Sequence, residues 1–419
     1  MRKTTRSWIG LVEVFVLLCL MTGTASAAAP SSGWDGEHII SVVSSGNGWE
    51  PAVAADPSAP YVYAGWMQYV GSKIQIKYAV SSDGGVTFGA AQTICPACGT
   101  GTGQYDIVLA TSSSGGVYAT YMQSNKISFA KSLDHGATWT PALTVSGTSW
   151  SDKPWIGVSP SGTDVYIAWA SRGNVVVVAS HNGGSSFSAP VQITNESYIY
   201  YYPNGATVLN NGTAVFAASE YPEKGNSTKN TGAVPIVVFR TSNGGSSWTR
   251  TAVDTLNTGA TYATSSVTTV ASDGTNLLLL YSGSLTVGAN GKVYVRRSTD
   301  SGATWSARTE MTTSAGGADA TSVAAAGKPG LFVITWMDNR GGGWNVWERE
   351  STDGAVTWSA DAKISDAPSG ASYKTTAGFG LPYGDYDMVA INSSGKAVAV
   401  MGEGDSTQTN GDIWVNHKQ

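Results

Sequence analysis

Short apolar stretches alternate along the chain with clusters of glycine, serine, asparagine and aspartate. Between residues 152 and 194 the apolar blocks read "KPWIGVSP", "DVYIAWAS", "NVVVVASH" and "SAPVQIT". Blocks this short, bounded by turn-forming residues, are typical of β-strands, and no stretch shows the three-to-four-residue apolar spacing of an amphipathic helix. The pattern predicts an all-β protein in which groups of four strands recur.

One phrase recurs between the third and fourth predicted strands of each group. It joins a hydroxyl, an Asp or Asn, glycine and a closing aromatic residue, as in "STDSGATWS", and we call it the turn phrase. Its six copies begin at Ser81, Ser132, Ser180, Thr241, Ser298 and Ser351. A period of about 50 residues suits a four-stranded unit, and such units arranged radially form a β-propeller.

The number of blades depends on how the two ends of the chain are read. Six turn phrases mark six blades, and three more strands follow the last phrase without one. The segment "EHIISVV" (residues 37–43) resembles a fourth strand and precedes the first blade. Pairing it with the last strand completes a seventh blade and removes two open sheet edges. We therefore predict a single seven-bladed propeller over residues 28–419, with six blades as the alternative.

The turn phrase resembles the Asp-box, or bacterial neuraminidase repeat, of sialidase-like propellers. The six copies extend the resemblance over nearly the whole chain. It implies that the Asp or Asn caps backbone N–H groups within a hairpin turn, on the face opposite the substrate funnel. Gly85, Gly136, Gly184, Gly245 and Gly302 occupy the position that favours positive φ, and Ala355 replaces glycine in the sixth copy. The phrase is expected to be scaffold and not the active site.

Composition narrows the environment and the partners. Residues 1–27 have a basic start, an apolar run and small residues before Ala27, which predicts a signal peptide and secretion. Only 13% of residues are charged, the net charge is −5, and no basic run occurs, which argues against nucleic-acid binding. No segment is predicted to span a membrane, and a monomer is expected. Cys95 and Cys98 favour a small disulfide over a redox pair or half a zinc site.

The loops leading into the first strands and following the second strands should share one face. Acidic residues enter the first strands, and we predict that they occupy corresponding blade positions: Glu50, Asp106, Asp152, Asp319 and Asp385. Tyr202 and Trp344 add aromatic surface near the same rim. Aromatic rings stack on sugars, and carboxylates bind hydroxyl groups, so this face predicts a carbohydrate-binding funnel.

The sialidase resemblance implies a specific set of catalytic residues. Tyr386 matches the family's nucleophilic tyrosine, Glu220 its polarising partner and Asp338 a possible acid, and Arg172 and Arg340 lie on loops suited to binding a substrate carboxylate. The family's Arg-Ile-Pro motif is absent, and "WEPAVAADP" stands in its place. The resemblance therefore favours an exo-sialidase-like glycoside hydrolase, with a non-catalytic glycan- or surface-binding propeller as the alternative.

The five acidic residues offer a second possible site. Carboxylates converging on one axis repel unless they are spread apart, protonated or bridged by a cation. They could hold Ca²⁺ through their oxygen atoms, although no cofactor is required. A pair of them could instead act as acid and base in glycoside hydrolysis.

Overall fold

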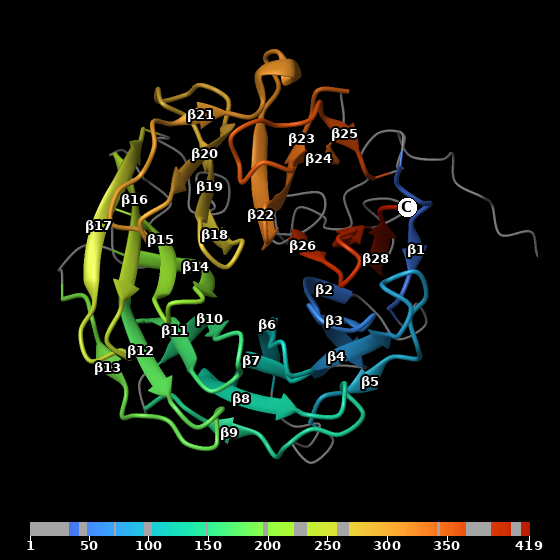
Figure 1. The fold of residues 1–419 in the computed structure, drawn as a ribbon, viewed down its shortest axis with the longest axis vertical. Coiled ribbons are helices and arrows are strands. Elements are labelled where there is room, and N and C mark those ends of the chain that lie inside the picture. Colours follow the sequence, from blue (N-terminus) through green and yellow to red (C-terminus); the bar gives the residue numbers. More distant parts are fainter. Residues whose placement is uncertain are drawn as a thin grey trace, which may run out of the picture.

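The computed structural model describes residues 33–41, 48–70, 73–95, 103–147, 150–195, 200–221, 233–257, 268–341, 344–365, 387–403 and 412–419. These residues form seven four-stranded antiparallel sheets around a central axis, which Figure 1 shows end-on. The architecture is a seven-bladed β-propeller, so the predicted fold class and the preferred blade number are confirmed. Within the described residues, no helix is long and apolar enough to cross a membrane.

The blades are numbered here in chain order, with strands given from the axis outwards. Blade 1 contains β2 (Gly48–Ala55), β3 (Val62–Val70), β4 (Lys73–Ser81) and β5 (Gln92–Thr93). Blade 2 contains β6 (Gln104–Thr111), β7 (Val117–Gln123), β8 (Lys126–Ser132) and β9 (Leu143–Thr144). Blade 3 contains β10 (Ser151–Val158), β11 (Val165–Ser171), β12 (Asn174–Ser180) and β13 (Val191–Gln192). Blade 4 contains β14 (Tyr200–Val208), β15 (Ala214–Tyr221), β16 (Val234–Thr241) and β17 (Thr249–Leu256).

The other three blades complete the ring. Blade 5 contains β18 (Thr268–Ser272), β19 (Leu277–Gly283), β20 (Lys292–Ser298) and β21 (Thr309–Glu310). Blade 6 contains β22 (Ala320–Lys328), β23 (Leu331–Asp338), β24 (Asn345–Ser351) and β25 (Ala362–Lys363), and the 3-10 turn η3 (Thr313–Ala315) precedes it. Blade 7 contains β26 (Asp387–Ile391), β27 (Ala397–Glu403), β28 (Asp412–His417) and β1 (His38–Ile39).

Burial between neighbouring blades explains the apolar second strands. Every residue of β11 is buried, because both faces of the sheet pack against adjacent blades. The second strands of blades 1, 3 and 6 each contribute a tryptophan that is almost fully buried, namely Trp66, Trp169 and Trp336. The first strands are packed more tightly still. A Cβ added at Gly327 of β22 would lie 2.3 Å from the carbonyl oxygen of Ser272, in the neighbouring blade.

The N-terminal strand closes the ring as predicted. In β1, His38 pairs with Val415 and Ile39 with Trp414 of β28, so segments from the two ends of the chain form one sheet. Trp34 makes a further bridge to Lys418. Figure 1 shows β1 beside β28 at the outside of blade 7. The strand is shorter than predicted, since Glu37, Ile40 and Ser41 are described outside it. Residues 42 and 43 and the predicted signal peptide lie outside the described residues.

The turn phrase joins the third and fourth strands, as predicted. In each copy the first hydroxyl donates to the Asp or Asn side chain and accepts a backbone N–H four residues later; in blade 5 these bonds are 2.8 Å and 2.8 Å long. The closing aromatics pack against the preceding blade: the ring centroids of Trp139 and Tyr78 lie 5.5 Å apart, and those of Phe187 and Phe129 lie 5.0 Å apart. The turn phrase therefore stabilises both its own hairpin and the packing between adjacent blades.

Candidate functional site

The first strands of blades 1, 2 and 3 share a bulge near their starting ends. The pairing register shifts between Trp49 and Ala52, between Tyr105 and Val108, and between Asp152 and Trp155. The first bulged residue in each case has a left-handed backbone, with φ of 49° at Glu50, 52° at Asp106 and 52° at Lys153. Non-glycine residues rarely adopt this conformation, and it concentrates at functional sites.

The three bulged side chains form one buried charge cluster. The Lys153 ammonium lies 2.6 Å from Asp106 Oδ1 and 3.9 Å from Glu50 Oε1. Glu50 Oε2 accepts a hydrogen bond of 2.9 Å from the backbone N–H of Asp106. Lys153 also lies 6.0 Å from the centre of the Tyr202 ring, which belongs to blade 4. The cluster therefore joins the first strands of four successive blades.

Asp152 is the titratable group at the edge of this cluster. Burial, and next the negative charge of Asp106, raise the pKa of the Asp152 carboxyl to about 7, although Lys153 acts in the opposite direction. The residue is only partly buried, and Trp150, two positions earlier, is 43% exposed. A carboxyl group that keeps its proton near neutral pH and reaches solvent has the properties of a general acid.

The predicted correspondence among the five acidic residues is wrong. Lys153, not Asp152, occupies the position of Glu50 and Asp106, and Asp152 precedes it. In blade 6 the bulge falls at Ser322, with φ of 49°, whereas Asp319 lies before β22. A bulge places two residues opposite one, so spacing along the sequence did not identify equivalent positions. Asp385 lies outside the described residues.

Lys153 was not identified from the sequence, although it decides the charge balance of the cluster. A signal was present: "WEP" in blade 1 and "DKP" in blade 3 both place a charged residue directly before proline at the start of a first strand. Lys153 supplies the bridging cation that converging carboxylates require, and the raised pKa of Asp152 supplies the protonated member. Two of the three predicted ways to relieve repulsion are thus present together.

Glu220, expected to polarise a tyrosine, is bound by an arginine. The Arg250 guanidinium of β17 donates two hydrogen bonds of 2.6 Å to the two carboxylate oxygens of Glu220. Only 6% of the Glu220 side chain is exposed. Tyr386, its expected partner, lies outside the described residues, so the tyrosine-nucleophile hypothesis stays a prediction.

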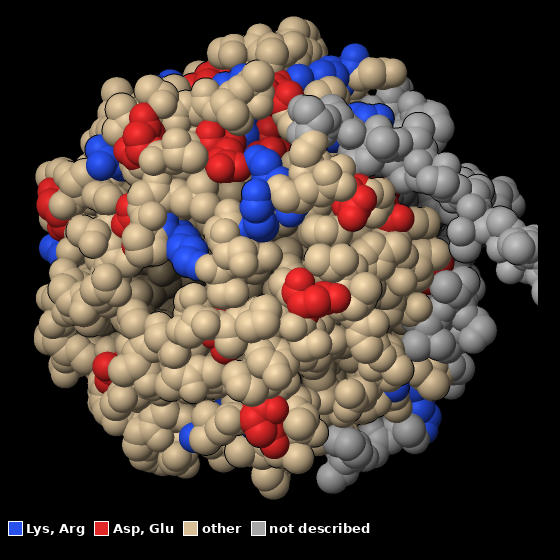
Figure 2. Space-filling view, turned by 45° about the vertical axis from the view of Figure 1, so that its right-hand side comes forward, with Lys and Arg blue, Asp and Glu red and all other residues tan. Residues whose placement is uncertain are grey.

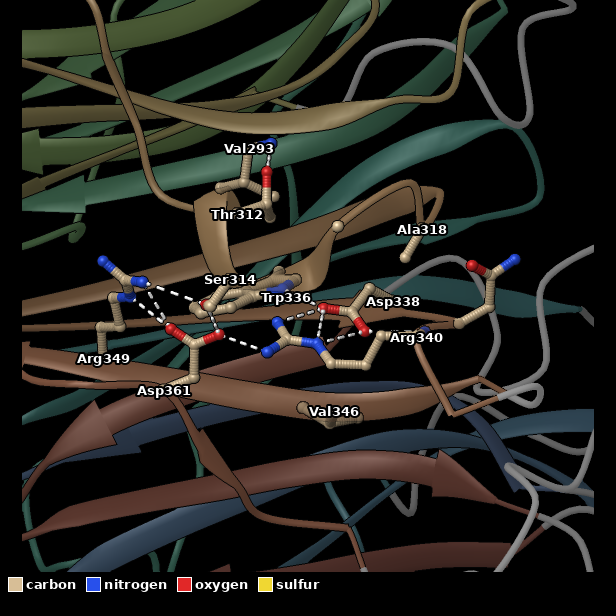
Figure 3. A network of polar contacts seen from close by, with 12 residues as sticks. Val293, Thr312, Ser314, Ala318, Trp336, Asp338, Arg340, Val346, Arg349 and Asp361 are labelled. Atoms are coloured by element: carbon tan, nitrogen blue, oxygen red, sulfur yellow. Dashed lines mark hydrogen bonds and ion pairs between the residues drawn. The ribbon is translucent and has the colours of Figure 1, made fainter.

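Asp338 and Arg340 belong to one ion-pair network, drawn in Figure 3. The Arg340 Nε donates to Asp338 Oδ1 at 2.9 Å, and another nitrogen of the same guanidinium bonds Asp361. Arg349 donates to the other oxygen of Asp361 at 2.6 Å, and Asp338 also accepts from the Trp336 indole at 2.8 Å. The Arg340 guanidinium lies 3.8 Å from the centre of the Trp347 ring. Each charge in the network therefore already has an opposite partner.

The other predicted site residues are dispersed. Asp319 accepts a backbone N–H from Gly291 at 2.6 Å, and Arg172 is exposed in the tight turn between β11 and β12. Tyr202 is buried in the core shared by blades 4 and 5, and Trp344 packs against the core of blades 6 and 7. Cys95 is disulfide-bonded, and its predicted partner Cys98 lies outside the described residues.

The described residues give little support to a metal centre or a phosphate-binding track. Among them, no group of three or more His, Cys, Asp or Glu side chains is placed to hold a metal ion. On the face seen in Figure 2, the described Lys, Arg, Asp and Glu side chains stand singly or in small mixed groups separated by uncharged residues. Binding to a nucleic-acid backbone depends on clustered basic side chains.

Comparison with known proteins identifies the fold. The sequence matches no protein-family profile and no curated protein. Among solved structures, an ulvan lyase of polysaccharide lyase family PL25 is similar with a TM-score of 0.56 and 10% identity, over 90% of this chain and 95% of that one. A protein of unknown function from Dyadobacter fermentans DSM 18053 gives 0.51 and 11%, over 91% and 97%. The Hadza microbial sialidase Hz136 gives 0.48 and 14%, over 92% and 68%. At these identities, the first two structures show a similar fold alone.

Proposed function

We propose that this protein is a secreted, glycan-active propeller and that it hydrolyses glycosidic bonds at the charge cluster around Asp152. The observation that carries the proposal is the raised pKa of Asp152, about 7, beside two further carboxylates on the first strands. Glycoside hydrolases pair a protonated carboxyl group with a second carboxylate. The exposed indole of Trp150 supplies an aromatic surface next to the acid, as sugar binding requires.

The cluster assigns a role to each side chain. Asp152 donates its proton to the glycosidic oxygen as the bond from that oxygen to the anomeric carbon breaks. Glu50 is the second carboxylate, and it either attacks the anomeric carbon or activates water. Lys153 holds Asp106 and Glu50 in place, while burial and then the Asp106 charge raise the pKa of Asp152. The configuration of the released sugar distinguishes attack by Glu50 from attack by water.

A non-catalytic glycan-binding protein is the second candidate, and one observation favours it. The carboxylates of Glu50, Asp106, Glu220 and Asp338 all lie beside a lysine or an arginine. Pairing of this kind suits a rigid binding surface as well as it suits catalysis. The two candidates differ in whether any bond of the glycan is broken.

Turnover by the wild type and by Asp152→Asn tests the proposal. Sialosides are assayed first, followed by neutral and uronic-acid glycosides. Asp152→Asn is expected to lower turnover by about 10²–10⁴-fold, the usual contribution of a general acid, while substrate binding persists. Because the acid must be protonated, the wild-type rate should fall as the pH rises through about 7. The exposed Asp300→Asn change in the turn phrase of blade 5, at the opposite end of the strands, is the matched control.

Three results would count against parts of this proposal. Full turnover by Asp152→Asn would remove the acid role and return attention to Tyr386. A rate that is flat between pH 6 and pH 8, on either side of the value of about 7, would contradict the pKa argument. Binding of glycans without release of sugar by the wild type would establish the binding candidate instead.

A further inference from the structure

The six turn phrases fall into two chemical classes. Four contain aspartate followed by threonine four residues later, in blades 1, 2, 5 and 6. In these, the threonine hydroxyl donates to Asp Oδ2, at 2.5 Å from Thr87 to Asp83 and 2.6 Å from Thr304 to Asp300. The hydroxyl proton is consumed inside the turn, and each turn carries a negative charge.

The phrases of blades 3 and 4 contain asparagine and serine instead, and the hydrogen bond runs the other way. The Asn182 amide donates to Ser186 Oγ at 2.8 Å, and the Asn243 amide donates to Ser247 Oγ at 2.8 Å. Each serine hydroxyl accepts this bond and donates none to another described residue. Neither turn therefore contains a carboxylate, and both serine hydroxyl protons remain available to a ligand. The blade 3 turn also contains His181, whose ring bonds the Asp164 carboxylate at 2.7 Å.

These two turns with asparagine and serine are neighbours, and they flank a groove of about 780 Å³ at the seam between blades 3 and 4. Both serines line the groove together with the half-buried rings of Phe187 and Trp248. Val191, on the same wall, is 50% exposed. Ser186 and Ser247 stand where the other four turns have threonine. Each serine lacks the threonine methyl group, so the groove is wider than it would be with threonine at both positions.

We infer that this groove is a second, non-catalytic binding site for a neutral sugar unit of a glycan. Its volume lies within the range of small-molecule sites, and it combines aromatic and aliphatic walls with a few hydroxyl donors. Apolar walls suit the C–H faces of a sugar ring, and the serine protons suit its oxygen atoms. Because both carboxylates are replaced by amides, neither turn places a carboxylate against the sugar oxygen atoms. His181, which also lines the groove, is already engaged by Asp164. The site is at the end of the strands opposite Asp152, so it does not depend on the proposed hydrolase.

Converting the two turns to the other class tests the inference directly. The variant carries Asn182→Asp, Ser186→Thr, Asn243→Asp and Ser247→Thr, which reproduces the turns of the other four blades. Isothermal titration calorimetry with cellohexaose, maltohexaose and hexa-N-acetylchitohexaose, all neutral, measures binding. The wild type is expected to bind at least one of them, and the variant about tenfold or more weakly. Asp300→Asn with Thr304→Ser in blade 5 is the reciprocal control and should leave binding unchanged.

Two further measurements keep the result interpretable. Val191→Lys is a second variant in case the four-site variant does not fold. It removes apolar surface at an exposed position of the groove and should also weaken binding. Asp152→Asn should retain this binding, since the site is remote from the cluster. Failure of the wild type to bind any of the three sugars would overturn the inference. So would undiminished binding by the four-site variant, or binding that Asp152→Asn abolishes.

Discussion

Left-handed backbone at single residues marks both the candidate site and the scaffold. At Glu50, Asp106 and Lys153 it accompanies a bulge that turns charged side chains into one cluster. At Ala355 it has no such role, because φ is 67° in the position that glycine occupies in the other turn phrases. An alanine in this region suffers a clash between Cβ and the backbone. The backbone of the sixth turn is therefore strained at Ala355, and this strain does not position any side chain of the candidate site.

Ala355→Gly should stabilise the protein. Relief of the left-handed strain is worth roughly 1–2 kcal/mol, and the greater freedom of glycine in the unfolded chain offsets part of it. We expect a gain of about 1 kcal/mol in the free energy of unfolding, measured by urea denaturation. Ala303→Gly in blade 5 is the control. Because Ala303 does not have a positive φ, glycine at this position relieves no strain and should lower the free energy of unfolding of the protein. Equal effects at both positions would mean that the strain at Ala355 is not significant.

For individual residues, the sequence predicted which acidic side chains lie near the axis better than it predicted their register on the strands. It identified Glu50, Asp106 and Asp152 as acids near one axis, and all three lie in or beside the cluster. It missed Lys153 and misaligned Asp152, because a bulge shifts the register without a mark in the apolar pattern. It also could not predict that Arg250 binds Glu220. Arg250 lies on β17, a fourth strand of eight residues, whereas the fourth strands of the other blades span two residues each.

Strands were predictable from the sequence wherever the two adjacent blades bury both faces of the strand. First, second and third strands are enclosed by adjacent blades, so their apolar blocks match the strands observed. The fourth strands were expected to be as long, but most pair over two residues, as β13 does at Val191–Gln192. The outermost strand has one neighbour and faces solvent, and its sequence therefore carries a weaker pattern. The turn phrase was correctly predicted to cap its own hairpin.

Asp300→Ala should expose the contribution of one turn. Asp300 accepts bonds from the Ser298 hydroxyl and from the backbone N–H and hydroxyl of Thr304, at 2.8, 2.9 and 2.6 Å. Losing a capping side chain of this kind costs about 1 kcal/mol. These bonds lower the pKa of Asp300 from 3.8 to about 2. A lowered carboxyl pKa contributes stability above pH 3.8 that is lost as the pH falls toward 2, so the difference between wild type and variant should shrink over that interval.

The control for this experiment is Asp300→Asn. Asparagine keeps Oδ1 for the backbone and can donate to Thr304, as Asn182 does to Ser186 in blade 3. It should retain most of the stability at neutral pH and lack only the part of the pH dependence near pH 3 that Asp300 contributes. Thermal unfolding at several pH values measures both variants. A loss of glycan turnover in Asp300→Ala without a change in melting temperature would contradict the scaffold role.

Closure of the ring determines whether seven blades act as one unit. If the first and last blades separate, the apolar sheet faces that pack between them are exposed, and without β1 the outer edge of β28 is unpaired. Here the two ends of the chain share blade 7, and the N-terminal segment also reaches blade 6. Trp34 is 3% exposed, and its indole donates to Glu348 of β24 at 3.1 Å. Ser41 bonds Asp412 at 2.8 Å, so contacts on both sides of β1 fasten it to the C-terminal strand.

Trp34→Ala should therefore destabilise the whole molecule and not only its N-terminus. Truncation of a buried tryptophan costs about 3–5 kcal/mol, whereas Trp150→Ala, at a 43% exposed position, should cost about 0.5 kcal/mol or less. Deletion of residues 28–46 should lower stability further, because it removes Trp34 together with β1 and leaves the outer edge of β28 unpaired. A synthetic peptide of residues 33–41 should restore part of that loss in proportion to the logarithm of its concentration, since it binds the folded ring alone. Urea denaturation curves for the truncated chain that match the wild type, or that ignore the peptide, would mean that blades 1 to 6 and the three remaining strands of blade 7 are stable without closure.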